Sequence, residues 1–240
     1  MIPSDVSRET VPNVSRETKP VLLDLFCGAG GATKGYMDAG FRVVGIDHKP
    51  QPDYPGDHFV QADAIDYLTA YGHKYDAIHA SPPCQASCRL TSGTNQGLVY
   101  PNLIPITRHL LAKLAVPTVI ENVLGSDLRR DLTLCGEMFG LKVQRHRYFE
   151  LGGWQMEAPA HVPHRGRVKG WRHGVEYEGY YYSVHGKGGG KGTIPEWQDA
   201  MGIHWTAKRR SLAEAIPPAY TRFIGNALIS ATQPALEAAS

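Results

Sequence analysis

Short apolar runs separated by helical patterns dominate the first 150 residues of the chain. Runs typical of buried strands lie at 21–26, 42–47, 75–80 and 117–120. Helices are predicted in the stretch that ends at Ala39 before Gly40, over 64–70 and over 103–115. Strands that alternate with helices predict an α/β fold with a doubly wound, mostly parallel sheet.

Polar and small residues follow each of these strands. The first strand runs into Gly28, the second ends at Asp47, the third leads to Cys84 and the fourth closes on Glu121. In doubly wound sheets ligands bind beyond the carboxyl ends of the strands. We therefore expect these groups to converge on one crevice.

The run Asp24–Gly31, Asp-Leu-Phe-Cys-Gly-Ala-Gly-Gly, has the features of a ligand-binding turn. Small residues let the backbone approach a ligand, and the following helix N-terminus favours anionic groups. The glycine spacing differs from Gly-x-Gly-x-x-Gly, so a dinucleotide fingerprint is not supported, and a purely structural turn is the alternative. Asp47 is placed to accept hydrogen bonds from ribose hydroxyls, and Asp63 to accept one from an adenine amino group. Both favour a cofactor that carries a nucleoside.

Cys84 follows Ser81-Pro82-Pro83, where two prolines stiffen the backbone and orient the thiol. A lone cysteine is often a small buried hydrophobe, but this position favours a nucleophile. An unperturbed cysteine, with a pKa of about 8.5, is only a few per cent thiolate at pH 7. Arg145 and Arg147 are candidates for the positive potential that a thiolate needs.

Two further motifs carry charge. Glu121 could pair with arginine or cap a helix, or burial could hold it protonated so that it acts as an acid. The run 145–149 predicts a strand with Arg145 and Arg147 on one face and His146 on the other. The arginines are then either ordinary surface charge or ligands for phosphate or carboxylate. Cys88 lies four residues after Cys84, but no further Cys/His pair shows metal-ligand spacing, so no metal is expected.

Taken together, these motifs resemble the DNA (cytosine-5)-methyltransferase family. The elements that carry the resemblance, in order, are Asp24–Gly31, Pro82-Pro83-Cys84-Gln85, Glu121-Asn122-Val123, Arg145-x-Arg147 and Gly225-Asn226, and they span residues 21–228. Val143 stands where the family usually has Gln, and the usual long motif near Arg210-Ser211-Leu212 is barely visible. The short chain is similar to phage-borne members of the family.

The resemblance implies a Rossmann-like, S-adenosylmethionine-dependent methyltransferase that flips its target cytosine out of duplex DNA. Cys84 would attack C6 of the base, which activates C5 towards the methyl group. Glu121 would donate a proton to N3. Arg147 would hold the O2 side and orient Glu121, while Arg145 would assist or contact phosphate.

The same resemblance assigns the cofactor site. Phe26 would stack on the adenine, Asp47 would bind the ribose, and Asp63 would bind the adenine amino group. Gly28 and Gly30 would line the methionine portion of S-adenosylmethionine. Asn226 would lie close by, with a helix predicted after Gly225-Asn226.

Charge distribution refines the domain organisation of the 240 residues, whose net charge is only +2. Between Lys142 and Arg210 the chain has 12 Lys/Arg against 6 Asp/Glu, which suits a polyanion partner, although a solvated basic face is the alternative. We predict a mobile arm over 1–19, a catalytic domain over 20–150, a short, irregular and basic target-recognition region over 151–210, and a segment over 211–240 that returns to the catalytic domain. The residues predicted to contact DNA are Arg165, Arg167, Lys169 and Arg172.

Composition is that of an ordinary globular protein, with 42% apolar and 20% charged residues. No run is long enough for a membrane helix, no apolar signal core opens the chain, and four cysteines do not make a disulfide scaffold. We expect a monomer in the cytoplasm of a bacterial or phage-infected cell, with double-stranded DNA as partner and no restriction partner identified.

Three alternatives to this function remain open. The same chemistry could act on RNA. The chain could be a catalytically silent nucleic-acid-binding homologue, although Cys84, Glu121 and Arg147 are all present. The donor could be a modified sulfonium that transfers a group larger than methyl.

Overall fold

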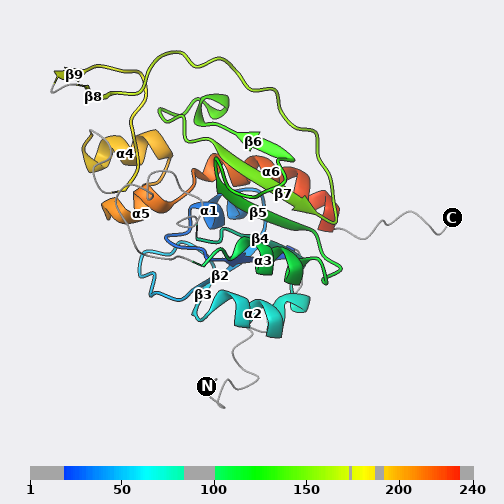
Figure 1. Ribbon diagram of the computed structural model, residues 1–240. Helices are drawn as coiled ribbons and strands as arrows, with labels where there is room; N and C mark the ends of the chain where they lie inside the picture. Colours follow the sequence, from blue (N-terminus) through cyan, green and yellow to red (C-terminus); the bar gives the residue numbers. More distant parts are fainter. Residues whose placement is uncertain (1–18, 84–100, 173–174, 187–191, 233–240) are drawn as a thin grey trace.

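A seven-stranded sheet forms the centre of the computed structural model, which describes residues 19–83, 101–172, 175–186 and 192–232 (Figure 1). The strand order is β3-β2-β1-β4-β5-β7-β6. The strands are β1 (Val21–Leu25), β2 (Arg42–Asp47), β3 (His58–Gln61), β4 (Ala77–Ala80), β5 (Thr118–Val123), β6 (Leu132–Leu134) and β7 (Arg147–Gly152). Strands β1 to β5 pair in parallel, whereas β7 is antiparallel to both β5 and β6. The predicted mostly parallel, doubly wound sheet is confirmed.

Helices cover both faces of this sheet (Figure 1). Helices α1 (Gly31–Asp38) and α6 (Pro218–Thr232) pack together on one face, and α2 (Ala64–Tyr71) and α3 (Ile104–Leu111) cover the other. Successive residues of a strand point to opposite faces, and accordingly Leu22 belongs to the first core and Leu23 to the second. Each apolar run is continuous because both of its faces are buried.

The strand order reverses between β1 and β4. From β1 the chain builds outward through β2 to β3, and it then crosses to β4 and builds the other half of the sheet. A crevice for ligands is expected at such a switch point, outside the carboxyl ends of β1 and β4. Phe26 and Ser81 directly follow these two strands.

The region over 151–210 has little sheet and a small core of its own. It contains β8 (Gly170–Arg172), β9 (Val175–Tyr177) and α4 (Ile194–Met201), and α5 (Arg209–Glu214) closes it. Its apolar cluster centres on Trp197, Met201 and Ile203 and also includes Val143 of the catalytic part. The β8–β9 hairpin projects from the body of the molecule (Figure 1). The boundaries at 151 and 210 stay predictions.

Four expectations about elements were wrong or incomplete. The edge strands β3 and β6 were not predicted, and α3 ends at Leu111 rather than at 115. Strand β7 begins only at Arg147, because Arg145 adopts a left-handed backbone with φ of 39°, so the alternation expected for 145–147 does not hold. Helix α6 starts at Pro218, well before Gly225.

Helix α4 was also missed, although the sequence carried its signal. Thr193 and Glu196 form a capping box, in which the Thr193 side chain accepts from the Glu196 amide and the Glu196 side chain accepts from the Thr193 amide. The predicted arm over 1–19 lies outside the described residues except for Lys19. Within the described part of the chain, no helix combines the length and apolar character that a membrane crossing requires.

Candidate active site

The end of β5 holds the Pro-Pro turn that precedes Cys84. The Asn122 side chain donates from Nδ2 to the carbonyl of Pro82 at 2.9 Å, and its Oδ1 accepts from the Val123 amide. Asn122 and Pro82 are both buried. Cys84 itself lies outside the described residues. In the chain it comes two residues after Pro82, which is bonded to Asn122, the residue that follows Glu121.

Glu121 and Arg147 form a buried ion pair on neighbouring strands. Arg147 Nε lies 2.9 Å from Glu121 Oε1, and the two side chains are only 13% and 7% exposed. Burial raises the pKa of Glu121 above its ordinary value, while Arg147, a hydrogen bond with Ser81 and Arg145 act in the opposite direction. The site thus combines a carboxyl group whose pKa is raised by burial with an arginine that fixes its orientation.

A buried polar network behind Glu121 was not predicted from the sequence. His79 on β4 contacts Ser81 Oγ through Nε2 at 2.9 Å and the Tyr36 hydroxyl through Nδ1 at 3.0 Å. Burial lowers the pKa of His79 to about 3, so the imidazole is neutral. A histidine inside a buried strand needs polar partners, and that requirement was the available signal. The network gives Ser81 a fixed position against Glu121.

Arg145 has a different place from the one expected. Its guanidinium donates from Nη1 to the carbonyl of Val184 at 2.6 Å, and from Nη2 to the carbonyls of Ala213, at 2.7 Å, and Ala215. These carbonyls belong to the region over 151–210 and to the C-terminal segment. Arg145 therefore ties three parts of the chain together, and we treat it as a positioning residue rather than as a phosphate contact.

The glycine turn after β1 forms a cradle next to Asp47. The amide of Gly28 donates to Asp47 Oδ2 at 3.0 Å, and the amide of Lys49 donates to Oδ1 at 2.9 Å. Phe26, Gly28 and Gly30 all have positive φ, at 59°, 50° and 78°. A Cβ on Gly28 would meet no atom within 4 Å, whereas one on Gly30 would collide with Pro55 at 2.4 Å. Open space at Gly28 beside a carboxylate fits a ligand that carries hydroxyl groups.

Asp24 lies behind this turn and was named only as part of the motif. It is completely buried, and its Oδ2 accepts from the Thr33 hydroxyl at 2.5 Å. Burial raises the pKa of Asp24 to about 7, against the lowering effect of the Thr33 hydrogen bond. Burial, Asp24 and Asp47 also raise the pKa of the Cys27 thiol, so Cys27 is no rival for the nucleophile.

One residue predicted to bind the cofactor already has partners within its own helix. Asp63 is the N-cap of α2, where its Oδ1 accepts from the amides of Ile65 and Asp66 at 2.8 and 3.0 Å. Its contact with adenine stays a prediction.

Asn226 is exposed on α6, and the adjacent Gly225 packs against Ala39 and Tyr36 at the far end of α1. Gly28 and Gly30 lie just before the start of α1. This helix has eight residues and is about 12 Å long, so its two ends are well separated. The structure therefore does not bring Asn226 together with the glycine turn.

The basic residues predicted to contact DNA are exposed or half-buried, and those with described side chains have partners. Arg165 Nε lies 2.6 Å from Glu137, and Lys169 Nζ lies 3.4 Å from Glu178. Arg167 donates to the carbonyl of Glu178 and stacks over the Tyr177 ring. The side chain of Arg172 is outside the described set. Arg167, which has a carbonyl rather than a carboxylate as partner, keeps the most available positive charge of the three.

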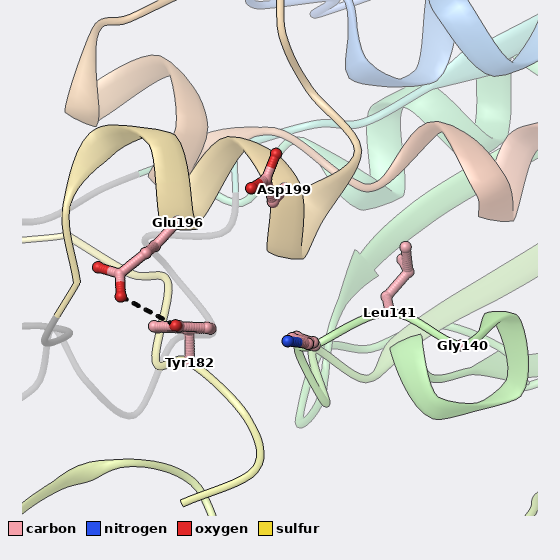
Figure 2. A pocket seen from close by; sticks show the side chains of 6 residues that line it. Gly140, Leu141, Tyr182, Glu196 and Asp199 are labelled. Atoms are coloured by element: carbon pink, nitrogen blue, oxygen red, sulfur yellow. Dashed lines mark hydrogen bonds between the residues drawn. The ribbon is translucent and has the colours of Figure 1, made fainter.

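A separate hollow of about 220 Å³ opens between the η3 turn (Gly136–Phe139) and α4. Figure 2 shows Tyr182, whose hydroxyl donates to Glu196 at 3.0 Å. Glu196 and Asp199 both belong to α4. The remaining lining residues are Gly140, Leu141 and Lys142. The hollow includes none of the predicted site residues and lies apart from the strand ends.

One cluster contradicts the expectation about metal-ligand spacing. Cys135, His146, His161 and His164 bring their ligand atoms within 4.8 Å of one another. The spacing of these residues along the chain did not reveal them as a set, because they come from three separate segments. The His161-x-x-His164 pair was the visible part of the signal.

Solved methyltransferase structures share this fold. S. pombe Dnmt2 methyltransferase matches with a TM-score of 0.55 and 16% identity, over 86% of this chain and 98% of that one. Entamoeba histolytica methyltransferase EhMeth matches with a TM-score of 0.56 and 12% identity, over 91% and 100%. A putative DNA modification methyltransferase encoded within an E. coli prophage gives a TM-score of 0.42 and 22% identity, over 55% of this chain and only 46% of that one. Neither a family model nor a curated protein matches.

The chain therefore has the Rossmann-like methyltransferase fold. The resemblance inferred from the motifs is confirmed at the level of the fold. The sheet order with its antiparallel β7 is typical of this fold.

Proposed function

We propose that the protein uses S-adenosylmethionine to methylate C5 of cytosine in DNA, through a covalent bond between Cys84 and C6 of a flipped-out base. The observation that carries this proposal is the buried Glu121–Arg147 pair, next in the chain to Asn122, which bonds the carbonyl of Pro82 in the turn that leads to Cys84. A carboxyl group with a raised pKa and a fixed arginine suit acid-assisted nucleophilic attack on a ring, and we assign the attack to Cys84.

Each residue has a role in the proposed reaction. The Cys84 thiolate adds to C6, and Glu121 gives its proton to N3 as negative charge builds on the ring. Arg147 holds Glu121 in place and faces the O2 side of the base. After methyl transfer the C5 proton leaves to a base or water, the bond between Cys84 and C6 breaks, and N3 returns its proton to Glu121. The base must leave the stack because C5 and C6 cannot be attacked from above and below within a duplex.

The cradle after β1 suits the methyl donor. When bound, S-adenosylmethionine supplies an electrophilic methyl group on a sulfonium. We assign the ribose to Asp47, the adenine to Phe26 and Asp63, and the methionine portion to Gly28 and Gly30. The open space at Gly28 and the carboxylate beside it support this assignment. Asn226 is left out, because it lies towards the other end of α1.

Transfer of labelled methyl groups from S-adenosylmethionine tests the proposal. Duplex DNA and tRNA are offered in parallel to the wild type and to Cys84→Ser. We expect label in duplex DNA with the wild type only, and unchanged S-adenosylmethionine binding by the variant. Label in tRNA alone would replace DNA by RNA as the substrate, and equal turnover by Cys84→Ser would overturn the nucleophile.

Mass spectrometry of nucleosides from the treated DNA identifies the transferred group. We expect 5-methylcytosine. A heavier substituent at C5 would point to a modified sulfonium donor.

A further inference from the structure

Four potential zinc ligands meet at the junction between the sheet and the region over 151–210. They are Cys135, His146, His161 and His164. Cys135 is buried, His146 and His164 are half-buried and His161 is exposed. None of the four belongs to the proposed catalytic machinery.

The register of the sheet places the first two ligands opposite each other. Strands β6 and β7 are antiparallel, and their last pair is Leu134 with Arg147. Cys135 and His146 are the next residues outward on the two sides. The Gly136 amide donates to the Gln144 carbonyl at 2.7 Å, which closes the end of this hairpin. Side chains at such opposite positions are close enough to bind the same metal ion.

The other two ligands come from the long connection that follows β7. In Figure 1 this segment runs as an arc outside β6, from the end of β7 towards β8. It has no helix or strand between Gly153 and Arg167 and contains no buried residue. Hydrophobic packing holds it only near its start, where Trp154 and Met156 pack against the core.

Polar contacts fix both ends of this connection, and at the start Trp154 Nε1 donates to the carbonyl of Thr118 at 3.1 Å. Arg165 pairs with Glu137, two residues after Cys135, and its amide donates to the Tyr181 hydroxyl at 2.8 Å. The Glu137 carboxylate also accepts from the Tyr181 hydroxyl. His164 is thereby held beside Cys135, and its Nε2 lies 3.3 Å from the Cys135 sulfur.

The donor atoms lie close to the spacing that tetrahedral zinc requires. Zn–S and Zn–N bonds of about 2.3 and 2.0–2.1 Å place the donors about 3.3–3.6 Å apart. The Cys135 sulfur and His164 Nε2 are 3.3 Å apart, and the Nε2 atoms of His146 and His161 are 3.0 Å apart. All ligand atoms lie within 4.8 Å of one another. Shifts of about 1 Å complete the geometry.

We propose that Cys135, His146, His161 and His164 bind one structural Zn²⁺ ion. One thiolate and three imidazoles are ligands that zinc prefers, and four protein ligands leave no open position for catalysis. The alternative is plain packing, because the His146 and His161 rings stack at 5.2 Å and His164 lies edge-on to both. Packing accounts for the ring contacts, but it does not explain why a buried thiol joins them.

The ion would join the residues that precede β7 to the connection that follows it. His146 directly precedes Arg147 of the active site, and His164 directly precedes Arg165 of the basic region. A metal bond between them closes the loop that starts after β7 and so reduces its conformational freedom. The metal site does not depend on the proposed methyl transfer.

Metal analysis of the tag-free, full-length protein tests the site. We expect one zinc per chain after dialysis, and a tetrahedral cobalt spectrum with a thiolate-to-cobalt band when Co²⁺ replaces zinc. His161→Ala, at an exposed position, is expected to fold normally and to bind zinc about 100-fold more weakly or worse. Cys135→Ser is expected to lose the thiolate-to-cobalt band.

His204→Ala serves as the matched control, because His204 is exposed and outside the cluster, and it should retain zinc and the band. Removing zinc from the wild type with a chelator should lower its melting temperature and increase protease cutting between Gly153 and Arg167. Full-length protein that binds neither zinc nor cobalt would overturn the proposal. Undiminished zinc in His161→Ala, or a thiolate band that persists in Cys135→Ser, would do so as well.

Discussion

The strand-end site and the region over 151–210 hold their charged groups by different means. At the strand ends Asp24, Glu121 and Arg147 are buried or nearly so, and each is fixed by hydrogen bonds from neighbouring strands and loops. In the region over 151–210 the arginines and lysines are mostly at the surface and pair with nearby acids and carbonyls.

The difference predicts where a substitution acts. Burial makes a charge expensive to leave unpaired, so changes at the strand ends should alter chemistry or stability strongly. Exposed pairs contribute little to stability, so changes among the basic residues should alter binding in small steps. The five predictions below test this contrast.

The largest effect is expected for Glu121→Gln. The amide can still donate a hydrogen bond but cannot transfer a proton, so methyl transfer in a single turnover should fall by about 10²–10³-fold. S-adenosylmethionine affinity should not change. Glu214→Gln, at an exposed position, is the matched control.

The pH dependence of the same variant gives an independent test. Burial raises the pKa of Glu121, so the protonated acid is lost as pH rises through that raised value and wild-type activity should fall on the alkaline side. The Gln variant has no such proton and should lack this alkaline fall. If both proteins lost activity identically at alkaline pH, the loss would come from a group other than Glu121.

Arg145→Ala should act mainly on stability. The substitution leaves the carbonyls of Val184, Ala213 and Ala215 without their charged donor. We expect the free energy of unfolding to fall by about 3 kcal/mol. Urea denaturation measures this. Arg145→Lys should restore little, because an ammonium group cannot span the three acceptors. If Arg145→Ala were fully stable but bound DNA weakly, Arg145 would be a phosphate contact and the contrast would fail.

Asp24→Asn should change how stability depends on pH. Because the pKa of Asp24 is raised to about 7 in the folded protein, its favourable contribution is complete below the unfolded pKa of about 3.9 and is lost as pH rises to about 7. The free energy of unfolding should therefore decline less between these pH values in the variant than in the wild type. Asp66→Asn, an exposed acid, should retain the wild-type slope.

The smallest effect is expected for Arg167→Ala. Loss of one phosphate contact should weaken DNA binding a few-fold and reduce the slope of log affinity against log salt by about one. Arg222→Ala, an exposed arginine on α6, should leave both unchanged. An unchanged salt slope in Arg167→Ala would remove this residue from the DNA contacts.

Sequence reasoning succeeded where burial imposes a simple pattern. Strand β2 has the predicted bounds of 42–47, because strands buried on both faces read as continuous apolar runs. Strand β5 was predicted to end before Glu121 but continues to Val123, so Glu121 lies within the strand. Edge strand β3 is only partly buried and short, so its pattern is weak.

Other features depended on contacts between distant segments. The neutral His79 network, the backbone contacts of Arg145 and the cluster around Cys135 join residues that are far apart in the chain. No local spacing rule identifies such sets. The helix over 194–201 is a different case, since its capping box was readable from Thr193 and Glu196.

The central claim is that the sulfur of Cys84 bonds to C6 of the target cytosine, and duplex DNA with 5-fluorocytosine at the target tests it most directly. Fluorine at C5 blocks the final elimination, so the protein with S-adenosylmethionine should form a stable adduct, and mass spectrometry should locate the modified base on the peptide that contains Cys84. Methylation of ordinary cytosine by the same preparation, with no adduct on the fluorinated DNA or with an adduct at another residue, would contradict the account.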